Sequence, residues 1–540
     1  MKKWPAAVYI LLFALAAAFR FLALKNGFVN DHFVYISGGR QMLFGEWPTR
    51  DWIDPGLPLM FGASALAQAV FGSTLFAEAM LVSLAFGLAA AFTAAAVRQL
   101  TGSMALAILA ALFETAVFPR TYSYPKIAAY AFEFWLYGRY LARPDRWRLF
   151  AMAAGVAVAF MFRHDHGLFL GVGAVLTILL ARESAAWKTS ARDAAMFTAI
   201  VVVLLLPYLA YVQTYGGLWV YFRTGVEFSQ REALRQWHVW PRVFGDERPL
   251  ESALVYMLYV LPLIAIGMLL ARGTRGDRPA VAGRIAPVAV VALLVDFSFI
   301  RDPLNTRLAD AIVPAVILGA WLISSAFSAS SRREFTVPLA LAFTLLMGAS
   351  VVTVGFTHEE INRAGLLGPA RDIPTRFAER TADLRARFTD YQLTPAARRL
   401  LPFFGYIDRC TSADDHLLVG GFMVELPFYS QRLFAAGQEY FGSYFGSDAN
   451  QRFTFDRLQR QRVPFVIVPS DSQAEFDRGF PLVAGYVRAR YAPLADVRMD
   501  DEQTIHILVN RDMPAAGRDA ETGWPCFRPH ASETQSHPSS

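Results

Sequence analysis

The sequence has few charged residues for its length. Of its 540 residues only 18% are charged and 55% are hydrophobic, whereas a soluble globular chain carries roughly 25% charged residues. The shortage is confined to the part before about Val354, after which charge becomes ordinary. This pattern excludes a single soluble core and predicts an apolar block followed by a water-soluble domain.

Cysteine is also scarce. The chain has two cysteines, Cys410 and Cys526, and both fall in the soluble part. In an oxidising compartment a pair of thiols tends to form a disulfide. We therefore predict a disulfide between these two residues.

Long apolar runs recur through the first part of the chain. Each has about the 17–25 residues that a helix needs to cross a bilayer, and in lipid the backbone groups of each run must be paired within a helix. The first run follows Lys2 and Lys3 as a signal peptide would, but no small-residue cleavage site follows it, so we interpret it as a retained span. We predict a polytopic α-helical membrane protein with about eleven transmembrane helices.

Short arginine-rich loops set the orientation, because such loops stay in the cytoplasm. They occupy residues 143–148, 182–192, 272–284 and 332–333. Alternating spans then place residues 163–167, 215–249, 301–307 and everything after Val354 outside. We predict a bacterial inner-membrane protein with a cytoplasmic N-terminus and a periplasmic C-terminal domain. Because the net charge of +6 arises mainly at span ends, no nucleic-acid partner is predicted.

Two segments on the outer side do not fit simple spans. Residues 57–71 are apolar but short, and prolines at positions 55 and 58 precede or begin them. If this segment crossed the membrane, a chain with a cytoplasmic N-terminus would have its arginine-rich loops on the outer side. We therefore predict a juxtamembrane helix. Residues 215–249 interleave arginine with tryptophan and tyrosine, which is typical of interfacial helices. They serve either for anchoring or for substrate binding.

The soluble part has the pattern of an α/β domain. Short β-rich runs at 416–419, 463–468 and 504–509 alternate with helix-prone stretches at 422–430 and 449–462. We predict a transmembrane module at 1–354, a periplasmic α/β domain at 355–510, and a disordered Pro- and Ser-containing tail at 511–540.

Ionisable residues of the first part collect at the outer ends of the predicted spans. A transporter of lipid-linked sugars would place such charges near the midplane on broken helices related by an internal repeat, and the sequence shows no such repeat. Carboxylates and cations at the span ends instead suit sugar transfer from a polyprenyl phosphate. This reaction needs a carboxylate to take the acceptor proton and cations to stabilise the phosphate leaving group.

Several motifs carry a family resemblance. The stretch Asn30-Asp31-His32-Phe33-Val34-Tyr35, followed by Gly45-Glu46-Trp47-Pro48, resembles the first periplasmic loop of the GT-C glycosyltransferases, which include protein O-mannosyltransferases and the lipid A aminoarabinose transferase. The stretch Asp54-Pro55-Gly56-Leu57-Pro58-Leu59 is similar to the proline-rich entry to that family's next helix. Tyr122-Ser123-Tyr124-Pro125-Lys126 and Arg163-His164-Asp165-His166-Gly167 extend the likeness.

The resemblance implies a fold and a site. It implies a GT-C module, a soluble α/β domain and inverting transfer of a hexose or pentose from a polyprenyl-phosphate donor to a glycan, lipid or protein acceptor, with membrane lipids around the protein. The residues that we expect to act are Asp31 as the catalytic base; Arg163, His166, Lys126 and Arg120 at the donor phosphate; and Asp54, Asp51, Tyr35, Arg301 and Arg307 in substrate binding.

Each assignment has an ordinary structural alternative. Asp31 could cap a helix, Arg163 could pair with Asp165 or Glu133, and Lys126 could extend to lipid headgroups. Arg301 and Arg307 have Asp302 and Asp310 as nearby partners. For the whole protein the alternatives are a transporter or flippase of lipid-linked sugars and a polysaccharide polymerase or ligase.

Two departures from the family pattern bear on metals and phosphate. His32 stands where many relatives have a second acidic residue, and Asp54 stands where the aminoarabinose transferase has a lysine. His164 and His166 lie two residues apart, unlike the i, i+4 spacing of a helical zinc pair. No cofactor is assigned, and a divalent cation stays open.

Overall fold

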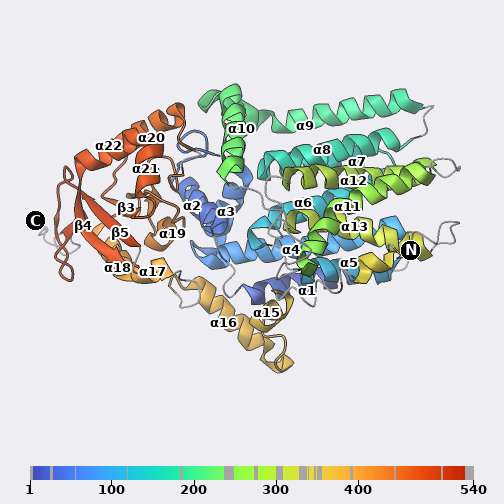
Figure 1. The fold of residues 1–540 in the computed structure, drawn as a ribbon, viewed down its shortest axis with the longest axis horizontal. Coiled ribbons are helices and arrows are strands. Elements are labelled where there is room, and N and C mark those ends of the chain that lie inside the picture. Colours follow the sequence, from blue (N-terminus) through green and yellow to red (C-terminus); the bar gives the residue numbers. More distant parts are fainter. Residues whose placement is uncertain are drawn as a thin grey trace, which may run out of the picture.

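The computed structural model describes residues 4–24, 28, 30–54, 56–117, 120–182, 186–235, 249–272, 278–299, 308–327, 337–338, 340–345, 348, 356–388, 393, 395–442, 445–499 and 503–528. Long helices run side by side through one part of the molecule, and a sheet with its own helices forms the other part (Figure 1). This arrangement matches the predicted apolar block and the α/β domain after it.

The long helices form one bundle, the helical module (Figure 1). Three described segments are long and apolar enough to cross a membrane, namely Ala6–Ala23, Leu75–Thr101 and Trp187–Tyr215, and five shorter helices are also apolar. The predicted number of about eleven spans stays a prediction. The module comprises α1 (Trp4–Ala23), α4 (Leu75–Thr101), α5 (Met104–Ala116), α6 (Tyr124–Ala142), α7 (Arg146–Phe162), α8 (His164–Leu180), α9 (Trp187–Tyr215), α11 (Pro249–Arg272), α12 (Arg278–Phe299) and α13 (Leu308–Phe327).

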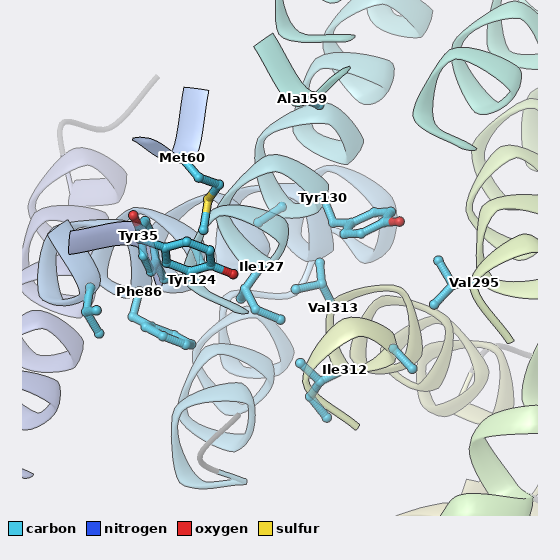
Figure 2. Packing of buried hydrophobic residues seen from close by; sticks show 14 of the residues in the cluster. Tyr35, Met60, Phe86, Tyr124, Ile127, Tyr130, Ala159, Val295, Ile312 and Val313 are labelled. Carbon is cyan, nitrogen blue, oxygen red and sulfur yellow. The ribbon is translucent and has the colours of Figure 1, made fainter. Parts of the chain in front are cut away.

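Helix α4 packs against α1, α5 and α6. Gly87 lets α1 come close, because a Cβ there would lie 2.8 Å from the Phe13 carbonyl oxygen. Small residues at helix contacts are typical of membrane bundles. Figure 2 shows Tyr124, Ile127 and Tyr130 along α6, with side chains of neighbouring helices around them.

Three further helices lie at the end of the bundle that faces the sheet (Figure 1). Helices α2 (Asp31–Leu43) and α3 (Pro58–Phe71) pack against each other, and α10 (Leu218–Arg235) runs across the bundle end. The contact of α2 with α3 is close, since a Cβ at Gly39 would lie 2.8 Å from the Ala65 nitrogen. The predicted helix at 57–71 is confirmed, and its juxtamembrane location stays a prediction that this placement supports.

The C-terminal domain contains a five-stranded sheet in the order β2-β1-β3-β5-β4. The strands are β1 (His416–Val419), β2 (Leu433–Phe434), β3 (Phe465–Pro469), β4 (Tyr491–Arg498) and β5 (Thr504–Asn510). β1 pairs in parallel with β2 and β3, whereas β5 is antiparallel to β3 and β4. The three predicted strands are confirmed within a few residues. β2 and β4 escaped prediction because β2 has only two residues and β4 carries proline and charge on an exposed edge.

Helices surround this sheet and connect it to the module. They are α15 (Phe356–Arg363), α16 (Ile373–Arg385), α17 (Pro395–Arg399), α18 (Leu401–Cys410), α19 (Leu426–Ser430), α20 (Asp448–Arg460), α21 (Gln473–Gly479) and α22 (Pro481–Arg490). The helices predicted at 422–430 and 449–462 are confirmed within a few residues as α19 and α20.

The predicted disordered tail is wrong for residues 511–528. This segment contains β6 (Gly517–Arg518) and β7 (Pro525–Cys526), which pair with each other. The Asp519 carboxylate binds the Arg409 guanidinium at 2.9 and 3.0 Å, and the predicted disulfide between Cys410 and Cys526 is present. The ion pair joins residues 110 positions apart, so the local Pro- and Ser-containing composition gave no sign of it. The predicted disulfide already tied Cys526 to the domain, which the prediction of a disordered tail did not take into account. Residues 529–540 lie outside the described part.

Candidate active site

A cavity of about 660 Å³ lies where the module meets the α/β domain. Its wall combines α2, the loop before α3, the α7–α8 corner, α10 and a segment of the α/β domain. The charged or titratable lining groups include Asp31, Asp54, Arg163, His164, Asp165 and Glu439. The cavity thus joins several residues that the sequence predicted with others that it did not.

Asp31 is the first residue of α2 and lines the cavity. The chain enters the helix through Asn30, whose φ of 34° lies in the left-handed region. Asn30 occupies the N-cap position and makes no side-chain cap hydrogen bond. Asp31 therefore stands at the first position of the helix and not at the N-cap position, and its charge suits the positive end of the helix dipole.

Arg163 connects α7 to α8 and pairs with Asp165. Its Nε lies 2.9 Å from Asp165 Oδ1 and 3.1 Å from Oδ2. Asp165 Oδ1 also accepts a hydrogen bond from the His166 backbone nitrogen at 2.9 Å. Both side chains of the ion pair line the cavity, so the pairing fixes the guanidinium there without removing it from the site.

His166 and Lys126 lie beside this pair and are not among the cavity-lining residues. His166 is buried, its Nδ1 is hydrogen-bonded to the Tyr130 hydroxyl, and its Nε2 lies 3.9 Å from Asp165 Oδ1. The charge of Lys126 attracts Asp165. Gly167 allows α8 to approach α7, because a Cβ there would lie 2.3 Å from Phe160 Cα. The structure thus gathers three of the four predicted phosphate ligands around Asp165, and of these three only Arg163 lines the cavity.

Asp54 connects α10 to the loop between α2 and α3 (residues 44–57), which we call the first loop. Its Oδ1 accepts hydrogen bonds at 2.8 Å from the backbone nitrogens of Gly56 and Leu57, and its Oδ2 accepts one at 3.0 Å from the Tyr221 hydroxyl. Burial raises the pKa of Asp54, while these donors and His164 oppose the rise. Asp54 lines the cavity, and its visible role is to hold Tyr221 and hence α10 against it.

His164 and Tyr208 extend this network. The Tyr208 hydroxyl donates to the Tyr221 hydroxyl at 2.8 Å, and His164 Nε2 lies 3.1 Å from the same oxygen. His164 Nδ1 bonds to the Phe160 carbonyl at 2.8 Å, and the two rings stack at 4.2 Å. The sequence analysis considered His164 only as a zinc ligand and missed this place in the cavity wall.

The remaining predicted residues fall in different places. Tyr35 lines the cavity, where burial and the Asp31 charge raise its pKa. Asp51 is not a lining residue, and its carboxylate accepts from the Trp47 nitrogen at 2.8 Å and contacts Arg457 at 3.2 Å. The Arg120 guanidinium contacts the Tyr122 hydroxyl, also away from the described lining. Arg301 and Arg307 lie outside the described residues.

Sequence reasoning missed the contribution of the α/β domain. Gln438, Glu439 and Tyr440 line the same cavity as Asp31. Burial raises the pKa of Glu439 well above its usual value, the nearby Asp31 charge raises it further, and the Ser37 hydroxyl lowers it. The only signal in the sequence was a run of polar and aromatic residues after β2, which does not reveal contact with a loop some 400 positions earlier.

The described ranges contain one group of three metal-ligating side chains whose donor atoms lie within 4.8 Å of one another. It consists of Cys410, Asp519 and Cys526. Because the two sulfurs are joined in the disulfide, this group has no thiolate to offer a metal.

Comparison with known proteins gives a structural likeness only. No family model matches the chain, and no curated protein matches it. The crystal structure of ArnT from Cupriavidus metallidurans bound to undecaprenyl phosphate is 17% identical with a TM-score of 0.49, covering 94% of this chain and 98% of that one. The apo state of the same protein is 17% identical with a TM-score of 0.47, covering 93% and 98%. Because both TM-scores are below 0.5, this likeness assigns no function to the chain.

Proposed function

We propose that the chain is a membrane glycosyltransferase of the GT-C type. It transfers a hexose or pentose, with inversion, from a polyprenyl-phosphate donor to a glycan, lipid or protein acceptor on the periplasmic side of the bacterial inner membrane. The observation that carries the proposal is the cavity at the module–domain junction, where Asp31 and the Arg163–Asp165 pair share one wall. A carboxylate and a cation in one cavity are what transfer from a phosphate leaving group needs.

The proposed reaction uses Asp31 as the general base. The acceptor oxygen attacks the anomeric carbon of the donor while its proton passes to the Asp31 carboxylate. The bond between that carbon and the phosphate oxygen breaks, and the electron pair leaves with the polyprenyl phosphate. Arg163 stabilises the additional negative charge on the phosphate, because its guanidinium is already oriented by Asp165.

The other predicted residues have supporting roles in the proposal. His166 and Lys126 stabilise the Asp165 carboxylate, which in turn orients the Arg163 guanidinium. Asp54 keeps α10 against the cavity through Tyr221. The substrate contacts of Asp51, Arg301 and Arg307 rest on the sequence alone. Arg120, which the sequence predicted at the donor phosphate, has no part in the proposed reaction because it is not among the described lining residues.

The disulfide supports the proposed sidedness. Cys410 and Cys526 are bonded, and structural disulfides persist in oxidising compartments such as the periplasm. A periplasmic α/β domain would place the cavity on the same side of the membrane as the acceptor.

The test is a transfer assay with purified full-length protein and a polyprenyl-phosphate sugar labelled in the sugar. The proposal expects the sugar–phosphate bond to break and the label to enter an envelope fraction that contains glycans, lipids and proteins. Label that crosses a vesicle membrane with its phosphate bond intact would show a transporter instead. Transfer of a whole preassembled glycan, rather than of one sugar, would show a polymerase or ligase.

A further inference from the structure

One section of the cavity wall comes from the turn that follows β2. Ala436 and Gly437 both have left-handed backbone angles, with φ of 62° and 67°. The Gly437 carbonyl accepts a hydrogen bond from the Ile53 nitrogen at 3.0 Å, and a Cβ at Gly437 would lie 2.9 Å from the Asp51 carbonyl oxygen. The turn is therefore fixed against the first loop, and Gln438, Glu439 and Tyr440 are held at the cavity.

Gln438 presents an unsatisfied acceptor at this wall. The residue is only 5% exposed, and its Nε2 donates to Thr454 Oγ1 at 2.7 Å. Its Oε1 is buried and has no hydrogen-bond partner within the described part of the chain. Buried acceptors are nearly always paired in native proteins, either with protein groups or with ordered water. This oxygen is therefore an acceptor for a donor that water supplies when no ligand is bound and that a hydroxyl group of a bound molecule can replace.

Glu439 adds a carboxyl group next to the Gln438 amide. It lines the cavity close to Ser37 of α2 and within the electrostatic influence of Asp31. A carboxyl group and an amide oxygen from adjacent residues offer acceptors for neighbouring hydroxyl groups. An anionic group at this position would meet the charge of Asp31, which disfavours a phosphate or carboxylate ligand.

Aromatic rings complete this section of the wall. The Tyr440 ring lies 5.8 Å from the Phe445 ring, and Phe445 stacks on Phe228 of α10 at 5.1 Å. Trp52 of the first loop also lines the cavity. A pyranose or furanose has an apolar C–H face that packs on aromatic rings and an edge of hydroxyl groups that bind amides and carboxyls.

We propose that residues 438–440 form the acceptor subsite and that the acceptor bound there is an uncharged sugar unit of a glycan. Glu439 and Gln438 Oε1 accept hydrogen bonds from its hydroxyl groups, and Tyr440 packs against its ring. This inference rests on the proposed function, because it places the attacking hydroxyl beside Asp31. It also gives the α/β domain a direct role in choosing the acceptor.

The test is binding to purified full-length protein in detergent, measured by saturation-transfer NMR and calorimetry. The probes are a pool of neutral oligosaccharides released from bacterial envelope glycans, Ser/Thr-containing hexapeptides, and polyprenyl phosphate. The variants are Glu439→Ala and Tyr440→Ala. Asp471→Ala is the control, because Asp471 is an exposed acidic residue of the same domain away from the cavity lining.

The expected result is about a tenfold weaker affinity for the oligosaccharides in Glu439→Ala and in Tyr440→Ala, with polyprenyl phosphate affinity within about twofold of wild type. Asp471→Ala should bind all probes as wild type does. Unchanged oligosaccharide binding in both variants would overturn the subsite, as would peptides binding in place of sugars. A parallel loss of polyprenyl phosphate would assign the residues to the donor.

Additional variants and a donor-cleavage assay distinguish misfolding of a variant, failure of the subsite and failure of the transferase function. If an alanine variant fails to fold, Glu439→Leu and Tyr440→Leu fill the same buried wall but remove the acceptor and the ring, and each should bind the sugars about tenfold more weakly than wild type. If wild-type protein binds the oligosaccharides but never cleaves the donor, the proposed transferase function fails while the sugar subsite stands. If it cleaves the donor and ignores the oligosaccharides, the subsite fails alone.

Discussion

Arg457 Nη2 lies 3.0 Å from Glu46 Oε1, which joins α20 of the α/β domain to the first loop of the helical module. The same guanidinium contacts Asp51 Oδ1 at 3.2 Å, and His416 Nε2 lies 3.1 Å from Glu46 Oε1. The two carboxylate side chains are only 17% and 13% exposed. This cluster holds the two parts of the protein together around the cavity.

Replacing Arg457 should weaken the attachment of the domain. In Arg457→Met both carboxylates lose a partner at a largely buried contact, which we expect to lower the free energy of unfolding by about 1–3 kcal/mol. The control is Arg488→Met, because the Arg488–Asp477 pair is exposed and such pairs contribute roughly 0–1 kcal/mol. Thermal melting and limited proteolysis between module and domain measure the effect. Equal melting temperatures and equal rates of proteolysis in the two variants would show that the cluster does not attach the domain to the module.

Asp31→Asn should abolish transfer without unfolding the protein. An asparagine has similar size but cannot take the acceptor proton, so the rate should fall roughly 10²–10⁴-fold. Labelled polyprenyl phosphate should still bind, since the Arg163–Asp165 pair is intact. Asp471→Asn serves as the matched control. Full activity of Asp31→Asn would refute the assignment of the base.

Arg163 and Arg120 should differ in their effect on donor binding. Arg163 lines the cavity and Arg120 is not among its described lining residues. Arg163→Ala removes a charged hydrogen-bond donor worth about 1.5–3 kcal/mol, so the donor affinity should fall roughly tenfold to over a hundredfold. Arg120→Ala should change it by less than about threefold. Calorimetric titration with polyprenyl phosphate measures the affinity of both variants. A larger loss of affinity in Arg120→Ala than in Arg163→Ala would place the phosphate site at Arg120 and not in this cavity.

Loss of the disulfide should destabilise the α/β domain. Cys410 and Cys526 are 116 residues apart in sequence, and their bond constrains the unfolded chain, so Cys410→Ser with Cys526→Ser should cost about 2–5 kcal/mol. Melting of the double variant measures this loss. In intact cells, a membrane-impermeant maleimide should label the thiols only after reduction. Labelling without reduction would contradict the bond, and absence of labelling after reduction and mild denaturation would contradict the periplasmic location.

Glu439 should make stability depend on pH. Its pKa in the folded protein is well above 4.5, mainly through burial, so above pH 4.5 the folded state holds a proton that the unfolded state releases. The free energy of unfolding should therefore fall as the pH rises from about 4.5 through the raised pKa. Glu439→Gln cannot ionise and should lose this slope. Melting curves across that pH range test the prediction, which identical slopes would contradict.

The sequence determined what depends on composition and local pattern. The scarcity of charge before residue 354 predicted a helical block that could cross a membrane, because unpaired backbone groups are too costly in lipid. The structure shows long apolar helices in this block. The alternation of short apolar runs with polar, helix-prone runs predicted β1, β3, β5 and α20. These elements could be predicted because the pattern that specifies each one lies within its own few residues. The presence of only two cysteines, both in the soluble part of the chain, was enough to predict their bond.

The tertiary structure alone decided which residues share the cavity. Asp31 and Glu439 lie on elements some 400 positions apart, and Arg457 reaches Glu46 across a similar separation. The structure also separated Arg163, which lines the wall, from His166, which lies behind it, although the two are three residues apart. Local pattern cannot show these outcomes, because they depend on how α2, α8 and the α/β domain pack together and on which side of each helix remains uncovered.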